Sequence, residues 1–304
     1  MSLVRTIYYN LAHFCLCMLP DKYYLRRQWK KEMEYKFDWN NPRSVNEKMM
    51  WLKLHDRKPL YTTLVDKVEV KRWITENFGP DILIPTYKVY DKAEDINLDE
   101  LPNEFVIKCN HDSGTVFICK DKANGVFVDK HMHGQSFDYI REYLKKRLKH
   151  SFYKDAREWP YKNVTPRIIV EKLMTTKSGA LPNDYKLFFI NGDFQFVYVS
   201  FDRAGVNDRC IYDKDWKRLP FVWVKPYDYR EGINSSDVLR PESFGEMLEF
   251  GEKIAKNFKC VRVDLYDVDG KMYFGEITPF HSAGYARFYP REYDYIYGEK
   301  IQLK

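Results

Sequence analysis

The chain has 304 residues, which is enough to bury a sizeable core and to form two lobes. Hydrophobic residues make up 44% and charged residues 31%, so the composition predicts a folded, soluble protein and excludes a disordered chain. The net charge of +6 comes from 50 Lys and Arg against 44 Asp and Glu. This mild excess favours anionic ligands or an anionic membrane surface without requiring either, and we expect no nucleic-acid partner.

The first segment, residues 3–19, is apolar but is interrupted by Arg5, Asn10 and His13. A helix that spans a bilayer needs about 20 consecutive apolar residues, so we expect neither a membrane span nor a cleavable signal peptide. The pattern predicts an amphipathic helix that ends at Pro20 and is followed by a basic run at 26–31. Such an element can lie on an anionic membrane or pack against the body of the protein. We expect a cytoplasmic protein, and peripheral contact with the inner face of the membrane stays open.

Six cysteines stand at positions 15, 17, 109, 119, 210 and 260. Their spacing matches no zinc or disulfide framework, and two of them fall inside expected strands. We therefore expect buried free thiols in a reducing compartment.

Local signals then define helices and strands in chain order. Ser44, three residues before Glu47, predicts a capping box that opens a helix running through Leu54. Further helices are expected at 64–78, 137–150 and 241–257. Strands are expected at 82–90, 104–109, 114–119, 167–173, 184–190 and 193–201, and the last two form a hairpin around Asn191-Gly192. Helices that alternate with antiparallel hairpins predict an α+β fold.

A second hairpin carries charged residues on one face. The segment 262–278 alternates in polarity on both sides of Asp267-Val268-Asp269-Gly270. A three-residue turn at 268–270 would place Arg262 opposite Glu276 and both residues on the face of Asp264, whereas a two-residue turn would put Asp264 and Glu276 on opposite faces. Two carboxylates on one face suit Mg²⁺ held between protein and nucleotide phosphates. The alternative is a solvated face with surface ion pairs.

Three further segments carry candidate binding groups. Lys108 ends an apolar strand and precedes the polar loop Ser113-Gly114-Thr115, an arrangement that can hold phosphates through backbone N–H groups and an ammonium. The strand end 171–173 offers backbone to an adenine edge. Lys186 opens the first hairpin.

Taken in order, these segments resemble the ATP-grasp superfamily and, within it, the TupA-like branch, which is named for a teichuronopeptide biosynthesis protein. The resemblance spans roughly residues 20 to 300. It is carried by 41–48 (NPRSVNEK), 51–53 (WLK), 66–67 (DK), 105–108 (FVIK), 184–186 (DYK), 261–264 (VRVD) and 274–278 (FGEIT).

The resemblance implies two α+β lobes that grip ATP and Mg²⁺, with a helical extension at 1–60, a central lobe with the phosphate loop at 61–165 and a C-terminal lobe with the metal hairpin at 166–304. Its implied site residues share four roles: phosphate binding (Lys108, Ser113, Gly114, Thr115, with Lys67 less certain), the adenine-side linker (Glu171, Lys172, Leu173), metal binding (Asp264, Glu276) and catalysis (Arg262, Lys186). Relatives carry Asn where this chain has Thr278, which puts a second metal in doubt.

The function that the resemblance implies is an ATP-dependent carboxylate–amine ligase. ATP would phosphorylate a carboxylate, and an amine would displace phosphate to give an amide. The substrates would be a sugar or uronic acid acceptor with an amino acid or peptide, in a cell-envelope or capsular polysaccharide. A sugar phosphotransferase, a glycosyltransferase and a nucleotide-binding scaffold are the alternatives.

The sequence leaves the roles of two histidines and of several aromatic residues undecided. His111 could touch a phosphate, although a solvated loop histidine is the preferred interpretation. His281 could bind an acceptor or simply turn the chain. Trp216, Trp223 and the tyrosines from 285 to 297 could stack on sugar rings, but packing is the safer interpretation.

Overall fold

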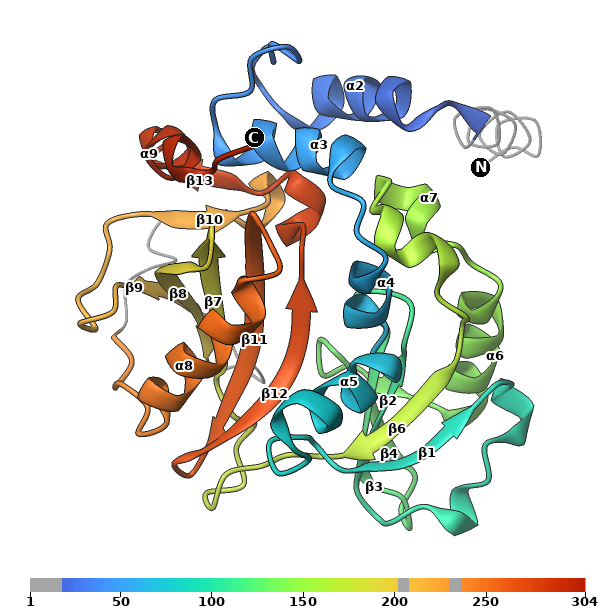
Figure 1. Ribbon diagram of the computed structural model, residues 1–304. Helices are drawn as coiled ribbons and strands as arrows, with labels where there is room; N and C mark the ends of the chain where they lie inside the picture. Colours follow the sequence, from blue (N-terminus) through green and yellow to red (C-terminus); the bar gives the residue numbers. More distant parts are fainter. Residues whose placement is uncertain (1–17, 202–207, 230–236, 304) are drawn as a thin grey trace.

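The computed structural model describes residues 18–201, 208–229 and 237–303. Two antiparallel sheets lie side by side, and helices near the N-terminus cross above them (Figure 1). The helix expected at 3–19 lies outside the described residues except for its last two positions, and Cys15 and Cys17 lie outside them entirely. The other four cysteines are free and buried, as predicted. Among the described residues, we find no helix with the length and apolar character that a membrane span requires.

In the part of the chain that the structure describes, four helices precede the first sheet, and one of them begins at the capping box that the sequence predicts. They are α2 (Asp21–Glu32), α3 (Val45–His55), α4 (Leu60–Val65) and α5 (Glu69–Phe78). The capping box between Ser44 and Glu47 is present at the start of α3. The single helix predicted at 64–78 is wrong, because the chain breaks at Asp66. The carboxylate of Asp66 accepts hydrogen bonds from the backbone of Val68 (2.8 Å) and Glu69 (3.3 Å), which starts α5 anew.

The first sheet has the order β1-β6-β2-β3-β4-β5. Its strands are β1 (Thr86–Tyr90), β2 (Phe105–Cys109), β3 (Val116–Asp121), β4 (Val126–Asp129), β5 (Gly134–Gln135) and β6 (Ile168–Lys172). Phe105 and Ile107 of β2 pack with Ile140 of α6 (Phe137–Leu148) in one apolar cluster. Because side chains alternate along a strand, Lys108 points to the opposite face, toward the second sheet.

The second sheet has the order β12-β11-β7-β8-β9. Its strands are β7 (Asp184–Ile190), β8 (Asp193–Phe201), β9 (Asp208–Tyr212), β11 (Cys260–Val268) and β12 (Lys271–Thr278). The predicted hairpin of β7 and β8 is confirmed, with both turn residues, Asn191 and Gly192, at positive φ. Helix α8 (Phe244–Ala255) covers one face and packs on Leu187 and Val263. The opposite face carries the charged side chains of β7 and β11.

The remaining elements close the upper edge of the second sheet or lie in the connections between strands (Figure 1). They are β10 (Val222–Val224) paired with β13 (Arg287–Tyr289), the helices α7 (Phe152–Ala156) and α9 (Glu292–Lys300), and the 3₁₀ turns η1 (Ala93–Asp95), η2 (Leu98–Glu100), η3 (Trp159–Asn163), η4 (Pro226–Asp228) and η5 (His281–Gly284). The domain boundaries at 60 and 165 stay predictions. Strand β6, just beyond residue 165, hydrogen-bonds between β1 and β2 in the first sheet.

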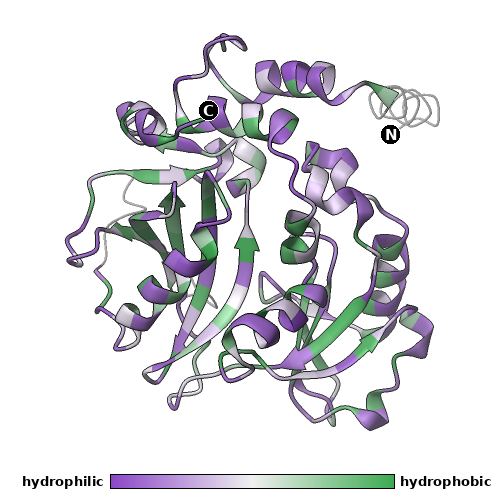
Figure 2. Ribbon diagram, in the orientation of Figure 1, coloured by the Kyte–Doolittle hydropathy of each residue, from purple (hydrophilic) through white to green (hydrophobic). Residues whose placement is uncertain are grey.

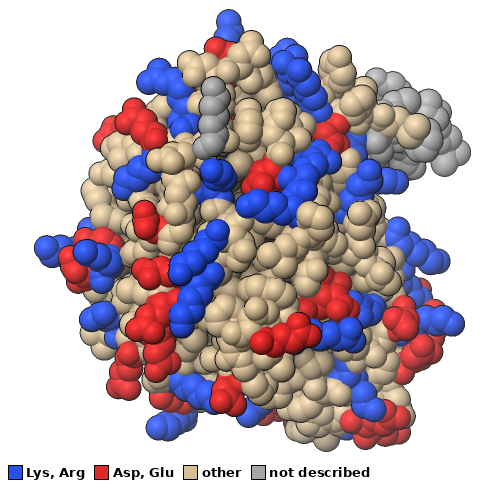
Figure 3. Space-filling model, viewed as in Figure 1, with Lys and Arg blue, Asp and Glu red and all other residues tan. Residues whose placement is uncertain are grey.

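Hydrophobic residues concentrate in the strands and on the inward faces of the helices (Figure 2). On the face shown in Figure 3, positive and negative side chains are interspersed, as the small net charge leads one to expect.

Candidate active site

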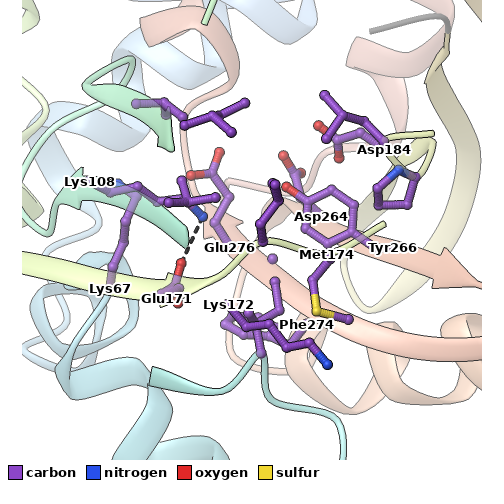
Figure 4. Close-up of a pocket in the computed structure, with 18 of the residues that line it drawn as sticks. Lys67, Lys108, Glu171, Lys172, Met174, Asp184, Asp264, Tyr266, Phe274 and Glu276 are labelled. Atoms are coloured by element: carbon purple, nitrogen blue, oxygen red, sulfur yellow. Dashed lines mark hydrogen bonds and ion pairs between the residues drawn. The ribbon is translucent and has the colours of Figure 1, made fainter. Parts of the chain in front are cut away.

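A cleft between the two sheets gathers the predicted site residues (Figure 4). Lys108 and Glu171 come from the first sheet, whereas Lys186, Asp264 and Glu276 come from the second. Apart from Arg262, every predicted site residue lines this cleft: Lys67, Lys108, Ser113, Gly114, Thr115, Glu171, Lys172, Leu173, Lys186, Asp264 and Glu276. The cleft therefore brings together groups as far apart in the chain as Lys67 and Glu276.

The wall on the first sheet is an ion triplet. Lys108 Nζ lies 2.8 Å from Glu171 Oε2, and Lys71 Nζ pairs with Glu171 Oε1. Burial alone would raise the pKa of Glu171, but Lys108 and Lys71 outweigh it and lower the pKa to about 2. Burial also lowers the pKa of Lys71. Two lysines thus face the cleft around one ionised carboxylate.

Buried hydrogen bonds hold the base of the loop that follows Lys108. Asp112 is buried, and its Oδ2 accepts hydrogen bonds from Thr115 Oγ1 (2.6 Å) and Arg147 Nε (2.8 Å). Lys67 Nζ donates to the carbonyl of Asp112. Gly114 has φ +98°, a conformation that side chains with a Cβ rarely adopt, which leaves the tip of the loop as exposed backbone.

His111 lies in this buried base of the loop rather than in the solvent. It is buried, with Nε2 lying 3.0 Å from the carbonyl of Arg147, and burial lowers its pKa. The interpretation of His111 as a solvated loop histidine is wrong, because α6 packs over the loop base.

The charged hairpin has the predicted face but a different register. The turn has two residues, Asp269 and Gly270, both at positive φ, and Asp264 lies opposite Glu276. The three-residue turn with Arg262 opposite Glu276 is therefore wrong. A bulge at Gly275 inserts one extra residue, which restores Asp264 and Glu276 to the same face. A Cβ on Gly275 would come within 2.8 Å of the Asp264 carbonyl, so the bulge favours glycine.

Arg262 binds both carboxylates of the hairpin. Its Nε and Nη2 donate to Asp264 Oδ1 (2.6 Å) and Oδ2 (2.7 Å), and Nη2 also donates to Glu276 Oε1 (3.0 Å) and Thr278 Oγ1 (3.2 Å). Lys186 Nζ lies 3.0 Å from Asp264 Oδ2. Desolvation would raise the pKa of Glu276, but Lys67, Arg262 and Lys186 lower it to about 2.

The donors at this hairpin suit a hard divalent cation. Asp264 and Glu276 share one face, and Asp184, which also lines the cleft, has a buried Oδ1 with no hydrogen-bond partner. Within the described ranges, no three His, Cys, Asp or Glu side chains converge into a complete metal cluster. Mg²⁺ commonly binds through one or two carboxylates and completes its shell with phosphates and water. The residues present therefore fit Mg²⁺ that is shared with a phosphate group.

A side chamber adjoins the cleft and contains Arg262. It is lined by Lys130, Tyr198, Arg209, Trp223, Lys225, Tyr227, Arg262 and His281, and it shares Lys186 and Glu276 with the cleft. His281 is buried, packs against Trp223 in a tilted arrangement with ring centroids 4.0 Å apart, and lies with Nδ1 2.5 Å from Arg262 Nη1. Burial and the charges of Arg262 and Lys186 hold the pKa of His281 well below its usual value.

Sequence reasoning missed two charged residues of the cleft. Lys71 lies on α5, and its pairing with Glu171 had no signal in the sequence. Asp184 lies two positions before Lys186 on the same strand face. The role of His281 beside Arg262 had no signal in the sequence.

Comparison with known families supports this architecture. A family model described as TupA-like ATPgrasp matches residues 47–302, so the chain belongs to the TupA-like ATP-grasp family. The predicted fold class, an α+β fold of the ATP-grasp type, is thereby confirmed, and the protein belongs to a class of ATP-grasp enzymes. The search of curated proteins finds no match.

Several solved structures are similar at low identity. D-alanine–D-alanine ligase from Bacillus anthracis, complexed with ATP, is 17% identical with a TM-score of 0.38, over 71% of this chain and 54% of that chain. Phosphoribosylamine–glycine ligase from Thermotoga maritima is 12% identical with a TM-score of 0.41, over 82% of this chain and 53% of that chain. The ATP-grasp ligase PsnB, complexed with a variant of its precursor, Mg and ADP, is 8% identical with a TM-score of 0.39, over 77% and 58%. The chain thus matches little more than half the length of each.

Proposed function

We propose that the protein is an ATP- and Mg²⁺-dependent carboxylate–amine ligase. The observation that carries this proposal is the cleft itself, in which Lys108 and Lys71 face Asp264 and Glu276 across the gap between the sheets of an ATP-grasp protein. Cations on one wall and paired carboxylates on the other are what a nucleotide triphosphate with a bound metal requires.

The nucleotide would bind with its phosphates between the two walls. Lys108 and Lys67 supply positive charge, and the backbone of 113–115 supplies N–H donors. When the phosphates bind, the ion pair between Lys108 and Glu171 would weaken, because Lys108 would then also contact a phosphate. Residues 172–173 would offer backbone to the base, beside the apolar side chains of Met174 and Ile84 that line the same cleft.

Asp264 and Glu276 would hold the metal, which neutralises charge on the phosphates. Thr278 accepts a hydrogen bond from Arg262 and donates one to Glu276 Oε1 (3.2 Å), so its hydroxyl is engaged within the hairpin. The bond to Glu276, which does not depend on Arg262, argues for one protein-held metal ion through Asp264 and Glu276 rather than a second one through Thr278.

Catalysis would consist of positioning and charge neutralisation. An acid carboxylate attacks the γ-phosphate, releasing ADP and forming an acyl phosphate, and an amine then displaces inorganic phosphate to give the amide. Arg262 stands at the border of cleft and side chamber, where it can neutralise the acid and the oxyanion that forms on its carbonyl. Lys186 would steady the transferring phosphate.

The side chamber supports an anionic sugar as the acid. Arg209, Lys225 and Arg262 give it positive charge, which is only partly offset by Asp228, 3.8 Å from Arg209. Trp223 and Tyr227 give it aromatic surface. A uronic acid of a cell-envelope or capsular polysaccharide, joined to an amino acid or short peptide, has this chemistry. The enzyme would act in the cytoplasm, and the exposed Tyr23, Arg27, Lys30 and Lys31 of α2 would allow peripheral contact with the inner face of the membrane.

Product analysis tests the proposal. The full chain is incubated with ATP, Mg²⁺, D-glucuronate or short polyglucuronate, and a mixture of amino acids, while ADP and inorganic phosphate are measured. A ligase releases both in equal amounts, whereas a sugar phosphotransferase releases ADP without phosphate and a glycosyltransferase releases a nucleoside diphosphate only from a nucleotide-sugar. Failure to bind Mg²⁺ with the non-hydrolysable analogue AMPPNP would exclude all ATP-dependent versions.

A further inference from the structure

The guanidinium of Arg262 occupies oxygens that a divalent cation would need. It makes a two-pronged contact with Asp264 at 2.6 and 2.7 Å and reaches Glu276 at 3.0 Å. The side chains of Arg262 and Asp264 are only 11% and 3% exposed, so this contact is shielded from water. Bidentate arginine–carboxylate pairs in such surroundings are among the stronger ion pairs.

The local charges explain why a metal ion and this contact exclude one another. Asp184, Asp264 and Glu276 carry three negative charges, and Arg262, Lys186 and the nearby Lys67 carry three positive ones. A free divalent ion added to this neutral group would lie beside three cations and leave a net positive charge. When the ion enters together with nucleotide phosphates, the negative charge of the phosphates balances its positive charge.

Arg262 has a second partner that does not compete with metal. Nη1 lies 2.5 Å from His281 Nδ1, and because the guanidinium always donates, the neutral ring accepts there and keeps its proton on Nε2. His281 is held by its close, tilted ring contact with Trp223. A guanidinium that left the carboxylates would therefore still be held at the side chamber.

The backbone that carries His281 is itself fastened. Ser282, Ala283 and Gly284 all have positive φ (48°, 57° and 77°), which is costly for the two residues with a Cβ. Lys53, fully buried on α3, donates to the carbonyls of Ala283 (2.6 Å) and Ala156 (2.8 Å) and so fixes this loop to α3 and to the last residue of α7. The partner of Arg262 is therefore rigid.

We propose that Arg262 is an internal counter-ion that competes with divalent cations for Asp264 and Glu276. When Mg²⁺ enters with the nucleotide, the guanidinium leaves these carboxylates, stays on His281 and turns its free donors toward the side chamber. This inference rests on the proposed function and adds an order to it: the site for the anionic acid is complete only after the metal–nucleotide complex has bound.

Binding of Mn²⁺ to the full chain, followed by electron paramagnetic resonance without nucleotide, tests the competition. Arg262→Gln should bind Mn²⁺ about tenfold more tightly than wild type or better, since a cation beside the metal is removed. Arg262→Lys keeps the charge but loses the two-pronged contact, so its Mn²⁺ affinity should lie between those of wild type and Arg262→Gln. It also serves as the test if Arg262→Gln fails to fold. Adding Glu276→Gln to either variant should abolish the gain.

The matched control is Arg167→Gln. Arg167 also bridges two carboxylates, Asp66 (3.1 Å) and Glu69 (2.7 Å), but it does so outside the cleft, and its loss should leave Mn²⁺ affinity unchanged. The inference would be overturned if Arg167→Gln gained as much Mn²⁺ affinity as Arg262→Gln. It would also be overturned if the gain survived the addition of Glu276→Gln, or if neither Arg262 variant gained affinity.

A crystal structure of the wild type with Mg²⁺ and AMPPNP gives the second readout. Arg262 should have left Glu276 and kept His281, and an arginine still bound to both carboxylates beside the metal would refute the displacement. The proposed function fails separately, if wild type binds no Mg²⁺–AMPPNP by calorimetry. In that case the Mn²⁺ measurements still decide whether Arg262 and metal compete.

Discussion

Replacement of Lys108 by alanine separates a nucleotide-binding role from a structural one. The ammonium holds buried Glu171 at 2.8 Å and also faces the cleft. A charge-assisted hydrogen bond to phosphate is worth about 1.5–3 kcal/mol, so Lys108→Ala should raise the Kd of Mg²⁺–AMPPNP by about 10- to 150-fold. Isothermal calorimetry measures this directly. Lys120→Ala, which removes an exposed lysine from the neighbouring strand β3, is the control and should leave the Kd unchanged.

The same variant makes a separate prediction for stability. A buried carboxylate left unpaired costs about 3–5 kcal/mol, but Lys71 still holds the other oxygen of Glu171. The free energy of unfolding should therefore fall by only about 1.5–3 kcal/mol in Lys108→Ala. Removing Lys71 as well should cost more than the two single losses added together, because Glu171 then has neither partner. A lowered unfolding free energy with an unchanged Kd would show that Lys108 is structural and refute its role with phosphate.

Three further predictions follow from the hairpin and the ion triplet. Glu276→Gln should weaken AMPPNP binding in the presence of Mg²⁺ far more than in its absence, as calorimetry with and without the metal would show; equal weakening would argue against a metal role. Gly275→Ala should also weaken AMPPNP binding more in the presence of Mg²⁺ than in its absence, and it should lower the free energy of unfolding by about 1–3 kcal/mol, because its Cβ would crowd the Asp264 carbonyl. The control is Gly134→Ala, whose Cβ would meet nothing within 4 Å and which should change neither quantity. The pKa of Glu171 is lowered to about 2, so its ionised form stabilises the fold fully above the unfolded pKa of about 4.3, and this stabilisation is lost as the pH falls toward 2. In Glu171→Gln, the free energy of unfolding measured by chemical denaturation should therefore depend less on pH between about 4.3 and 2. An unchanged pH dependence in this range would contradict the pairing of Glu171 with the two lysines.

Much of the fold follows from signals within a few residues of one another. The capping box of Ser44 and Glu47 and the Asn191-Gly192 turn act over three or four positions, and both appear as predicted. The prediction of one helix at 64–78 failed for a reason that is equally local. Asp66 can serve either as a helical residue or as a cap, and periodicity alone does not decide between them.

The charged hairpin shows how two departures from prediction can cancel. The two-residue turn at Asp269-Gly270 would place Asp264 and Glu276 on opposite faces of a regular hairpin, and the bulge at Gly275 reverses that outcome. Turn residues are visible in a sequence, but the bulge depends on how closely two strands approach. The expected face was therefore right although the expected register was wrong.

The sequence by itself determined the type of each candidate group and, where a strand is regular, the face on which it lies, because side-chain alternation and turn chemistry operate within single elements. Only the tertiary structure decided the partners. Glu171 meets Lys71 from a helix a hundred positions earlier, and Arg262 meets His281 from the loop beyond the next strand. Such pairs form where burial makes an unpaired charge costly, and burial depends on how the whole chain packs.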